Sequence, residues 1–120
     1  MITGFVNASR EAIIEVLVRG PNQQEYKIEA IIDTGFNGSI SLPPRIVDSL
    51  DLPFRRRGRA ILANGGETIF DIYETIVTWD GQSRRVVVDE ADPDPLVGME
   101  VLHGAEMKVQ AIEDGDVIII

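Results

Sequence analysis

The tripeptide Asp33-Thr34-Gly35 carries the side chains of this sequence that are best suited to chemistry. It follows Ile31 and Ile32, two large apolar residues that predict a strand buried on both faces. Such a strand would carry the Asp33 carboxylate into an interior where an unpaired charge is costly, so a partner or a catalytic task is expected. Thr34 adds a hydroxyl that donates and accepts hydrogen bonds, and Gly35 allows a second backbone to approach closely. An ordinary strand-ending turn is the alternative interpretation.

The composition restricts the classes of function. The 120 residues include 11 Lys+Arg, 20 Asp+Glu and no cysteine, and the net charge is −9. This negative charge repels nucleic acid and anionic membranes, so neither is expected as a partner. The lack of cysteine excludes disulfide scaffolds, thiol catalysis and thiolate metal sites, and it agrees with a reducing compartment. With no long apolar run and no signal-peptide pattern, we expect one cytoplasmic domain spanning residues 1–120.

Histidine chemistry is also restricted, because His103 is the only histidine. One chain therefore cannot build a Ser-His pair, a Cys-His pair or a multi-histidine metal site, and no metal or other cofactor is expected. Asp92 and Asp94 lie in the charged, proline-broken connector Asp89–Pro95, where a solvated loop is a better interpretation than a cation site. The basic run from Arg55 to Arg59 is interpreted as an exposed strand face rather than a grip for an acidic partner.

Closely spaced turn signals predict a mostly β fold. Glycine-containing turns separate short apolar or β-branched runs, and this spacing describes a small closed β-barrel. Short helices are expected over Arg45–Leu50, after Pro43-Pro44, and over Met99–His103, ending at Gly104. The expected strands are Ala12–Arg19, Tyr26–Ile32, Ser39–Leu42, Arg59–Ala63, Thr68–Trp79, Arg84–Val88, Met107–Ile112 and Val117–Ile120.

Two further segments bear on the role of Asp33. Residues 60–70 predict a hairpin with the glycine-rich tip Ala63-Asn64-Gly65-Gly66, which could close over a cleft. In Pro95–Leu102, an apolar pair runs into Gly98 and then into a helical turn. Taken singly, the two segments also fit an ordinary hairpin and plain core packing.

Together and in this order, Ile31–Gly35, Ala63–Gly66 and Leu96–Gly98 resemble the retropepsin-like aspartic proteases, and the small prokaryotic members in particular. In that family a strand ends in Asp-Thr-Gly, a flap hairpin follows, and an apolar-apolar-Gly segment leads into a helix beneath the active site. The resemblance covers nearly the whole chain, from Ala12 to Ile112. One departure is the tip Asn64-Gly65-Gly66, which lacks the apolar-Gly-Gly-apolar pattern of viral enzymes.

The resemblance implies an aspartic endopeptidase with Asp33, Thr34 and Gly35 in the catalytic loop and Ala63, Asn64, Gly65 and Gly66 in the substrate-binding flap. Peptide hydrolysis by carboxylates needs two of them beside one water, and the chain has one Asp-Thr-Gly. A homodimer that pairs two copies of Asp33 around a peptide or protein substrate is therefore expected. The alternative function is a catalytically weak or inactive dimerisation or peptide-binding module.

The apolar C-terminus Val117–Ile120 leaves one structural question open. A bare aliphatic strand invites pairing and aggregation unless it is covered. The family's use of terminal strands in its dimer favours covering by a partner copy. Burial within the chain's own barrel is an equally good interpretation.

Overall fold

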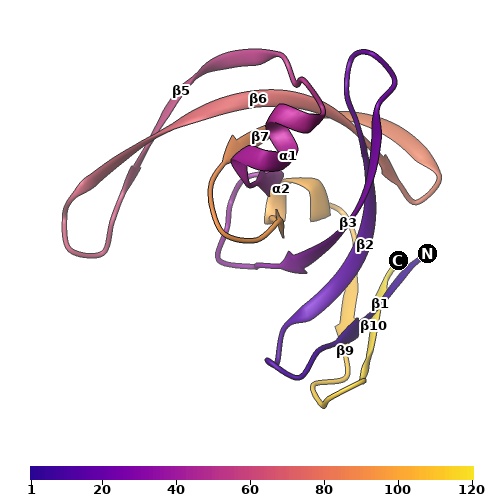
Figure 1. Cartoon of the computed structure of the whole chain (residues 1–120). Coiled ribbons are helices and arrows are strands. Elements are labelled where there is room, and N and C mark those ends of the chain that lie inside the picture. Colours follow the sequence, from indigo (N-terminus) through magenta and orange to yellow (C-terminus); the bar gives the residue numbers. More distant parts are fainter.

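The structure of the chain, a computed structural model, describes residues 1–120 and is built mostly of β-strands with two short helices (Figure 1). No helix in it combines the length and the apolar character needed to cross a membrane. The elements in chain order are β1 (Ile2–Val6), β2 (Ala12–Arg19), β3 (Glu25–Ile32), β4 (Ile40–Leu42), α1 (Pro44–Ser49), β5 (Phe54–Ile61), β6 (Glu67–Trp79), β7 (Gln82–Glu90), β8 (Leu96–Val97), α2 (Met99–Leu102), β9 (Met107–Val109) and β10 (Asp116–Ile119).

The strands β6, β7, β4, β8, β3 and β2 pair in that order, and β2 pairs again with β6 to close a barrel. Leu17 of β2 lies opposite Thr78 of β6 at the closing seam. Each strand of the ring contributes a side chain with no exposed surface, so the core is packed from all sides. These side chains are Val18, Ala30, Ile40, Val77, Val88 and Val97. The mostly β barrel expected from the sequence is therefore confirmed.

The two helices close the barrel where the sequence predicted them. Pro44 occupies the first turn of α1, whose apolar residues Ile46 and Val47 are buried. Helix α2 follows Gly98 directly, buries Val101 and Leu102, and ends before Gly104, which has a φ of +88°. Both helices begin and end within about one residue of their expected bounds.

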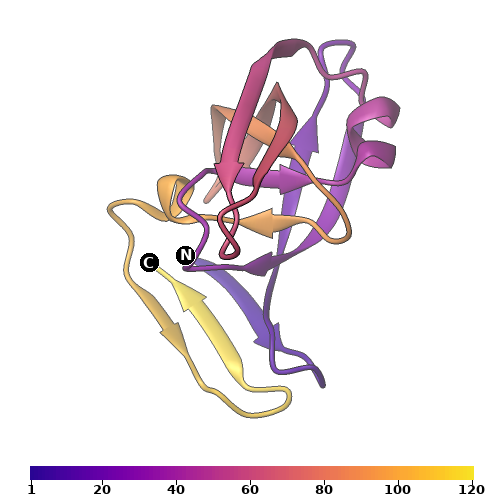
Figure 2. The same cartoon turned by 90° about the vertical axis from the view of Figure 1, so that its left-hand side faces the viewer.

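A small terminal sheet continues from the barrel through β1, β10 and β9. Figure 2 shows these strands extending away from the barrel. Strand β10 pairs with β1 on one side and β9 on the other, and Val117 and Ile119 are only 0% and 2% exposed. Only Ile120, at 72%, remains largely exposed. The C-terminal strand is therefore covered by its own chain: its edges pair within the terminal sheet, and Val117 and Ile119 join the same hydrophobic core as the barrel residues.

Three expected strands have wrong boundaries, each for a reason of pairing. Strand β5 begins at Phe54 and ends at Ile61, because the whole basic run pairs with β6. Strand β9 ends at Val109, since the chain turns there: the Ile112 N–H donates to the Gln110 carbonyl and the Gly115 N–H to the Ile112 carbonyl. Strand β7 continues to Glu90 beside β4, which shortens the expected connector.

Strand β1 was not predicted at all. Its glycine, Gly4, weakens the strand pattern, but a Cβ there would lie 1.9 Å from the Ile13 carbonyl oxygen of β2. The glycine therefore allows the close approach of β1 to β2.

Deleting Val117–Ile120 should destabilise the whole chain. Two fully buried aliphatic side chains are lost with the strand, at about 1.5 kcal/mol or more each, together with the pairing of β1 and β9. Thermal unfolding followed by circular dichroism measures the loss. Ile120→Ala, which changes only an exposed side chain, is the control and should shift stability by less than about 0.5 kcal/mol. A deletion variant as stable as this control would contradict the assignment of β10 to the chain's own core.

Candidate active site

The backbone at Asp33 is held by the parallel pairing of β3 with β8. Ile31 and Ile32 lie opposite Leu96 and Val97, and the Asp33 N–H donates to the Val97 carbonyl oxygen at 2.9 Å. Asp33 is thus the first residue beyond β3, yet its backbone remains bound to the neighbouring strand. The carboxylate stands on a fixed support at the end of two paired strands.

A tight turn then orients the Asp33 side chain. The Gly35 N–H donates to Asp33 Oδ1 at 2.9 Å, and the Phe36 N–H donates to the Asp33 carbonyl oxygen at 3.1 Å. The turn binds one carboxylate oxygen and leaves Oδ2 without a hydrogen-bond partner in the chain. A carboxylate held in this way presents its free oxygen in a fixed direction, as general acid–base chemistry requires.

Gly98 crosses directly behind this turn. Its N–H donates to the Ser39 carbonyl at 2.9 Å, and the next N–H, of Met99, donates to the Phe36 carbonyl at 2.8 Å. A Cβ at Gly98 would lie 2.1 Å from the Gly38 carbonyl oxygen, so no larger residue fits without displacing the backbone. The structure therefore brings Leu96–Gly98 against the loop of residues 33–39 between β3 and β4, here called the Asp33 loop.

The exposure of the Asp33-Thr34-Gly35 tripeptide differs from expectation. Asp33 is half-buried, while Thr34 and Gly35 are exposed, and Ile31 and Ile32 are themselves only half-buried. The expected strand buried on both faces is wrong at this end: Ile31 pairs with β2 on one edge and β8 on the other, but its face and that of Ile32 are only partly covered. The Thr34 hydroxyl makes no hydrogen bond within the chain.

The hairpin of β5 and β6 projects from the barrel, and its tip carries the expected flap residues (Figures 1 and 2). The Leu62 N–H donates to the Gly66 carbonyl at 2.7 Å, and the Gly65 N–H donates to the Leu62 carbonyl at 2.9 Å. Gly65 has a φ of +82°, which glycine adopts without strain. Ala63, Asn64, Gly65 and Gly66 are all exposed, and no hydrogen bond joins them to the Asp33 loop.

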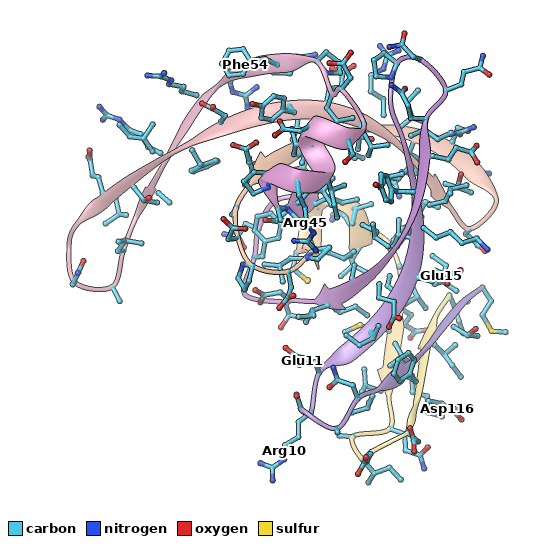
Figure 3. The ribbon with its side chains drawn as sticks, in the orientation of Figure 1. Arg10, Glu11, Glu15, Arg45, Phe54 and Asp116 are labelled. Atoms are coloured by element: carbon cyan, nitrogen blue, oxygen red, sulfur yellow. The ribbon has the colours of Figure 1, made fainter.

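Ion pairs stiffen the outer face of this hairpin. Arg57 lies 3.6 Å from Asp71, Arg59 lies 3.7 Å from Glu67, and Glu74 pairs with both Arg55 and Arg85. Apart from Glu74 the partners are largely exposed, so each pair is worth at most about 1 kcal/mol. The basic run thus occupies an exposed strand face, as the sequence predicted, and most of its charge is neutralised. At the base of the hairpin, the rings of Phe54, labelled in Figure 3, and Tyr73 pack edge to face with centroids 5.8 Å apart.

A cavity of about 460 Å³ lies between the hairpin, the Asp33 loop and the end of β7. Sequence reasoning missed this cavity, because Asp89 and Glu90 were assigned to a connector; the extension of β7 beside β4 places them in its wall. The residues that line the cavity are Phe36, Ser41, Ala60, Thr68, Ile69, Phe70, Asp89, Glu90, Ala91, Asp92 and Leu96.

Two carboxyl groups in this wall have raised pKa values. Burial is the main cause for Asp89; nearby Glu100 raises its pKa further, and Arg56 opposes the shift. Burial also raises the pKa of Glu90, with smaller effects from the negative charges of Asp71, Asp48 and Asp92. The Asp89 and Glu90 carboxylates therefore lack the solvation or the counter-ion that would stabilise their charge.

Gly98→Ala should destabilise the chain by about 3 kcal/mol, because the added methyl group meets the backbone of the Asp33 loop. Chemical denaturation measures the loss. Met99→Ala is the matched control: it changes the adjacent, exposed side chain and should cost less than about 1 kcal/mol. Equal stability of the two variants would mean that the crossing tolerates a side chain and does not fix the loop.

Two solved structures share this architecture. A retropepsin-like aspartic protease from Rickettsia conorii is 18% identical, with a TM-score of 0.64, and the match covers 98% of this chain and 87% of that one. EIAV protease, in a complex with the inhibitor HBY-793, is 19% identical, with a TM-score of 0.55 and coverage of 80% and 88%. No protein-family model and no curated protein matches the sequence. The chain thus has the retropepsin-like fold that its three segments predicted.

Proposed function

We propose that residues 1–120 form an aspartic endopeptidase domain that hydrolyses peptide bonds as a homodimer. The observation that carries this proposal is the Asp33 loop: an Asp-Thr-Gly turn, held from behind by Gly98, in a chain with the retropepsin-like fold. A hairpin with an open glycine tip and a cavity beside the loop give a peptide a place to bind. Fold likeness at this identity supports only the architecture, so the argument for function rests on the site.

The proposed chemistry uses two carboxylates and one water. One Asp33 carboxylate takes a proton from the water as the water attacks the peptide carbonyl carbon, and the other donates a proton to the carbonyl oxygen. Two carboxylates at close range cannot both ionise easily, so the pair holds one shared proton. The free Oδ2 of Asp33 is the atom available for this role, since Oδ1 is occupied by the Gly35 N–H.

The second carboxylate must come from a second copy, because the chain has a single Asp-Thr-Gly. The exposure of Thr34 and Gly35 supports this arrangement. In a two-fold dimer, Thr34 bonds across the axis and Gly35 lets the two loops approach, and one chain alone gives the Thr34 hydroxyl no partner. The terminal strands take a different part here from the one that the resemblance suggested, since β10 is already paired on both edges.

The flap residues Ala63, Asn64, Gly65 and Gly66 are assigned to substrate binding. An extended peptide lying between the hairpin and the Asp33 loop would bond through its backbone like an added strand. At the tip the Gly65 carbonyl is open to such contact, whereas the N–H groups of both glycines are bonded within the turn. The hairpin closes over the peptide by bending at its exposed end, while the Phe54–Tyr73 contact holds its base.

A peptide-binding module without hydrolysis is the second candidate. The flap tip favours a binding module, because Asn64-Gly65-Gly66 has no apolar residue to anchor a closed flap. The apolar side chains that precede the tip, Ile61 and Leu62, are exposed. The two candidates differ in whether the Asp33 pair transfers a proton.

Asp33→Asn should abolish peptide hydrolysis while the fold stays intact. Asparagine keeps the shape and can still accept the Gly35 N–H bond, but it removes the group that titrates. A peptide-library digest across pH measures the loss, and circular dichroism checks the fold. Wild-type activity should follow a bell-shaped pH profile on the acidic side of neutrality, set by the pair rather than by either carboxylate. Cleavage that persists in the variant would refute the aspartic mechanism, and a wild-type chain that cleaves nothing at any pH would favour the binding module.

The chain should form a dimer that depends on Thr34. Thr34→Ala removes one hydrogen bond from each copy, and at about 1 kcal/mol for each bond the dissociation constant of the dimer should rise about thirtyfold. Sedimentation equilibrium measures this constant. Ser9→Ala, which removes an exposed hydroxyl from the turn between β1 and β2, is the matched control. A wild-type chain that stays monomeric at high micromolar concentration would contradict the dimer.

A further inference from the structure

We propose that the cavity between the β5–β6 hairpin and the Asp33 loop binds a lysine or arginine side chain of the peptide, with Asp89 receiving its charge. This inference rests on the proposed function, because the cavity opens beside the loop on which the scissile bond would lie. Asp89 would then determine specificity, and the substrates would be peptides with a basic residue close to the cleaved bond. A volume of about 460 Å³ lies within the usual range for ligand sites and can accept a long side chain.

The walls of the cavity suit the aliphatic part of a basic side chain. Phe36 comes from the Asp33 loop, Phe70 from the hairpin and Leu96 from β8, so apolar surface faces the cavity from three elements. Lysine and arginine pack their methylene stems along apolar surface and direct the charged head to polar groups. The cavity offers both apolar and polar surface. A purely apolar substrate residue would contact only the apolar part.

The polar end is formed by Asp89 and Ser41. They lie opposite each other in the parallel pairing of β4 with β7, and Ser41 also lies opposite Leu96 of β8. Ser41 is only 3% exposed, yet its hydroxyl makes no hydrogen bond within the chain. Because Ser41 lines the cavity, its hydroxyl is free to bind a donor that enters, together with the Asp89 carboxylate.

The charge around the cavity favours a cation. None of Asp89, Glu90 and Asp92 takes part in an ion pair, whereas the acidic residues on the outer face of the hairpin are paired. Arg56 is the positive group that acts on Asp89, but it forms no ion pair with any carboxylate and is exposed. The carboxylates do not form a group of three that could hold a metal ion, so an organic cation is the better fit.

The cavity also discriminates against other side chains. A neutral residue would cover Asp89 without replacing its lost solvation, and an acidic residue would add repulsion from three carboxylates. Because burial already raises the pKa of Asp89, its ionised form costs the folded chain stability at any pH above the ordinary value of about 3.9. Asp89→Asn should therefore unfold at the same or a higher temperature at pH 7, which makes it a usable test variant.

The first measurement is cleavage of a library of internally quenched octapeptides in which each position in turn holds arginine or its neutral isostere citrulline. At one position near the cleaved bond, the kcat/KM for arginine should exceed that for citrulline by about ten- to hundredfold, the range expected for a charge-assisted hydrogen bond. In Asp89→Asn this ratio should fall to near one. Asp116→Asn, which removes an exposed carboxylate at the far end of the molecule (Figure 3), is the matched control and should keep the ratio.

The second measurement does not depend on hydrolysis. Acetyl-Ala-Arg-Ala-amide is titrated into the wild-type chain by two-dimensional NMR, beside the citrulline peptide. The arginine peptide should produce saturable shifts at the amides of Phe36, Asp89 and Leu96, with at least tenfold weaker binding for citrulline and for Asp89→Asn. Binding without cleavage would uphold the cavity and refute the endopeptidase. Cleavage without a preference for arginine over citrulline, or equal binding of the two peptides, would overturn this inference and leave the proposed catalytic function standing.

Discussion

The backbone crossing at Gly98 is the constraint on which the candidate site depends. Two distant chain segments meet there, and the crossing leaves no room for a Cβ beside the Gly38 carbonyl. The hydrogen bonds from Asp33 to Val97 and from Met99 to Phe36 lie on either side of this contact. Because these bonds join backbone groups, the position of the Asp33 carboxylate is set by the barrel rather than by its side-chain neighbours.

The single chain holds a site that is ordered and yet incomplete. Its loop is tightly bonded from behind, while the Thr34 hydroxyl and one oxygen of Asp33 have no hydrogen-bond partner in the chain. Carboxylate chemistry on a peptide bond requires a second carboxyl group. A second copy of the chain in a symmetric dimer would supply it from its own Asp33. Strand β10 is paired on both edges within the chain, so the proposed association does not need its backbone and depends on the loop and the surfaces around it.

In the cavity beside the loop, the residue proposed to select a basic substrate side chain, Asp89, also lowers the stability of the folded chain. The chain keeps Asp89 half-buried, where the charged carboxylate is poorly solvated and has no ion pair, although a neutral residue of the same shape would cost less. Unfavourable groups of this kind tend to persist where a ligand requires them. The outer face of the same hairpin is different. Its arginines and carboxylates form ion pairs with one another, so these charges need no partner from outside the chain.

The sequence by itself determined the barrel, both helices and the three segments that form the site. Alternating apolar residues, proline at a helix start and glycine at a turn act over a few neighbouring residues. Such patterns can therefore be recognised in the sequence without knowledge of the fold. It did not determine the first strand, the length of β5 or the end of β9, because these depend on the strands that pair with them. Only the tertiary structure placed Asp33 at the barrel surface, enclosed β10 within its own chain, and set Ser41 beside Asp89. Burial and register between distant strands are properties of the packed chain, and no local pattern encodes them.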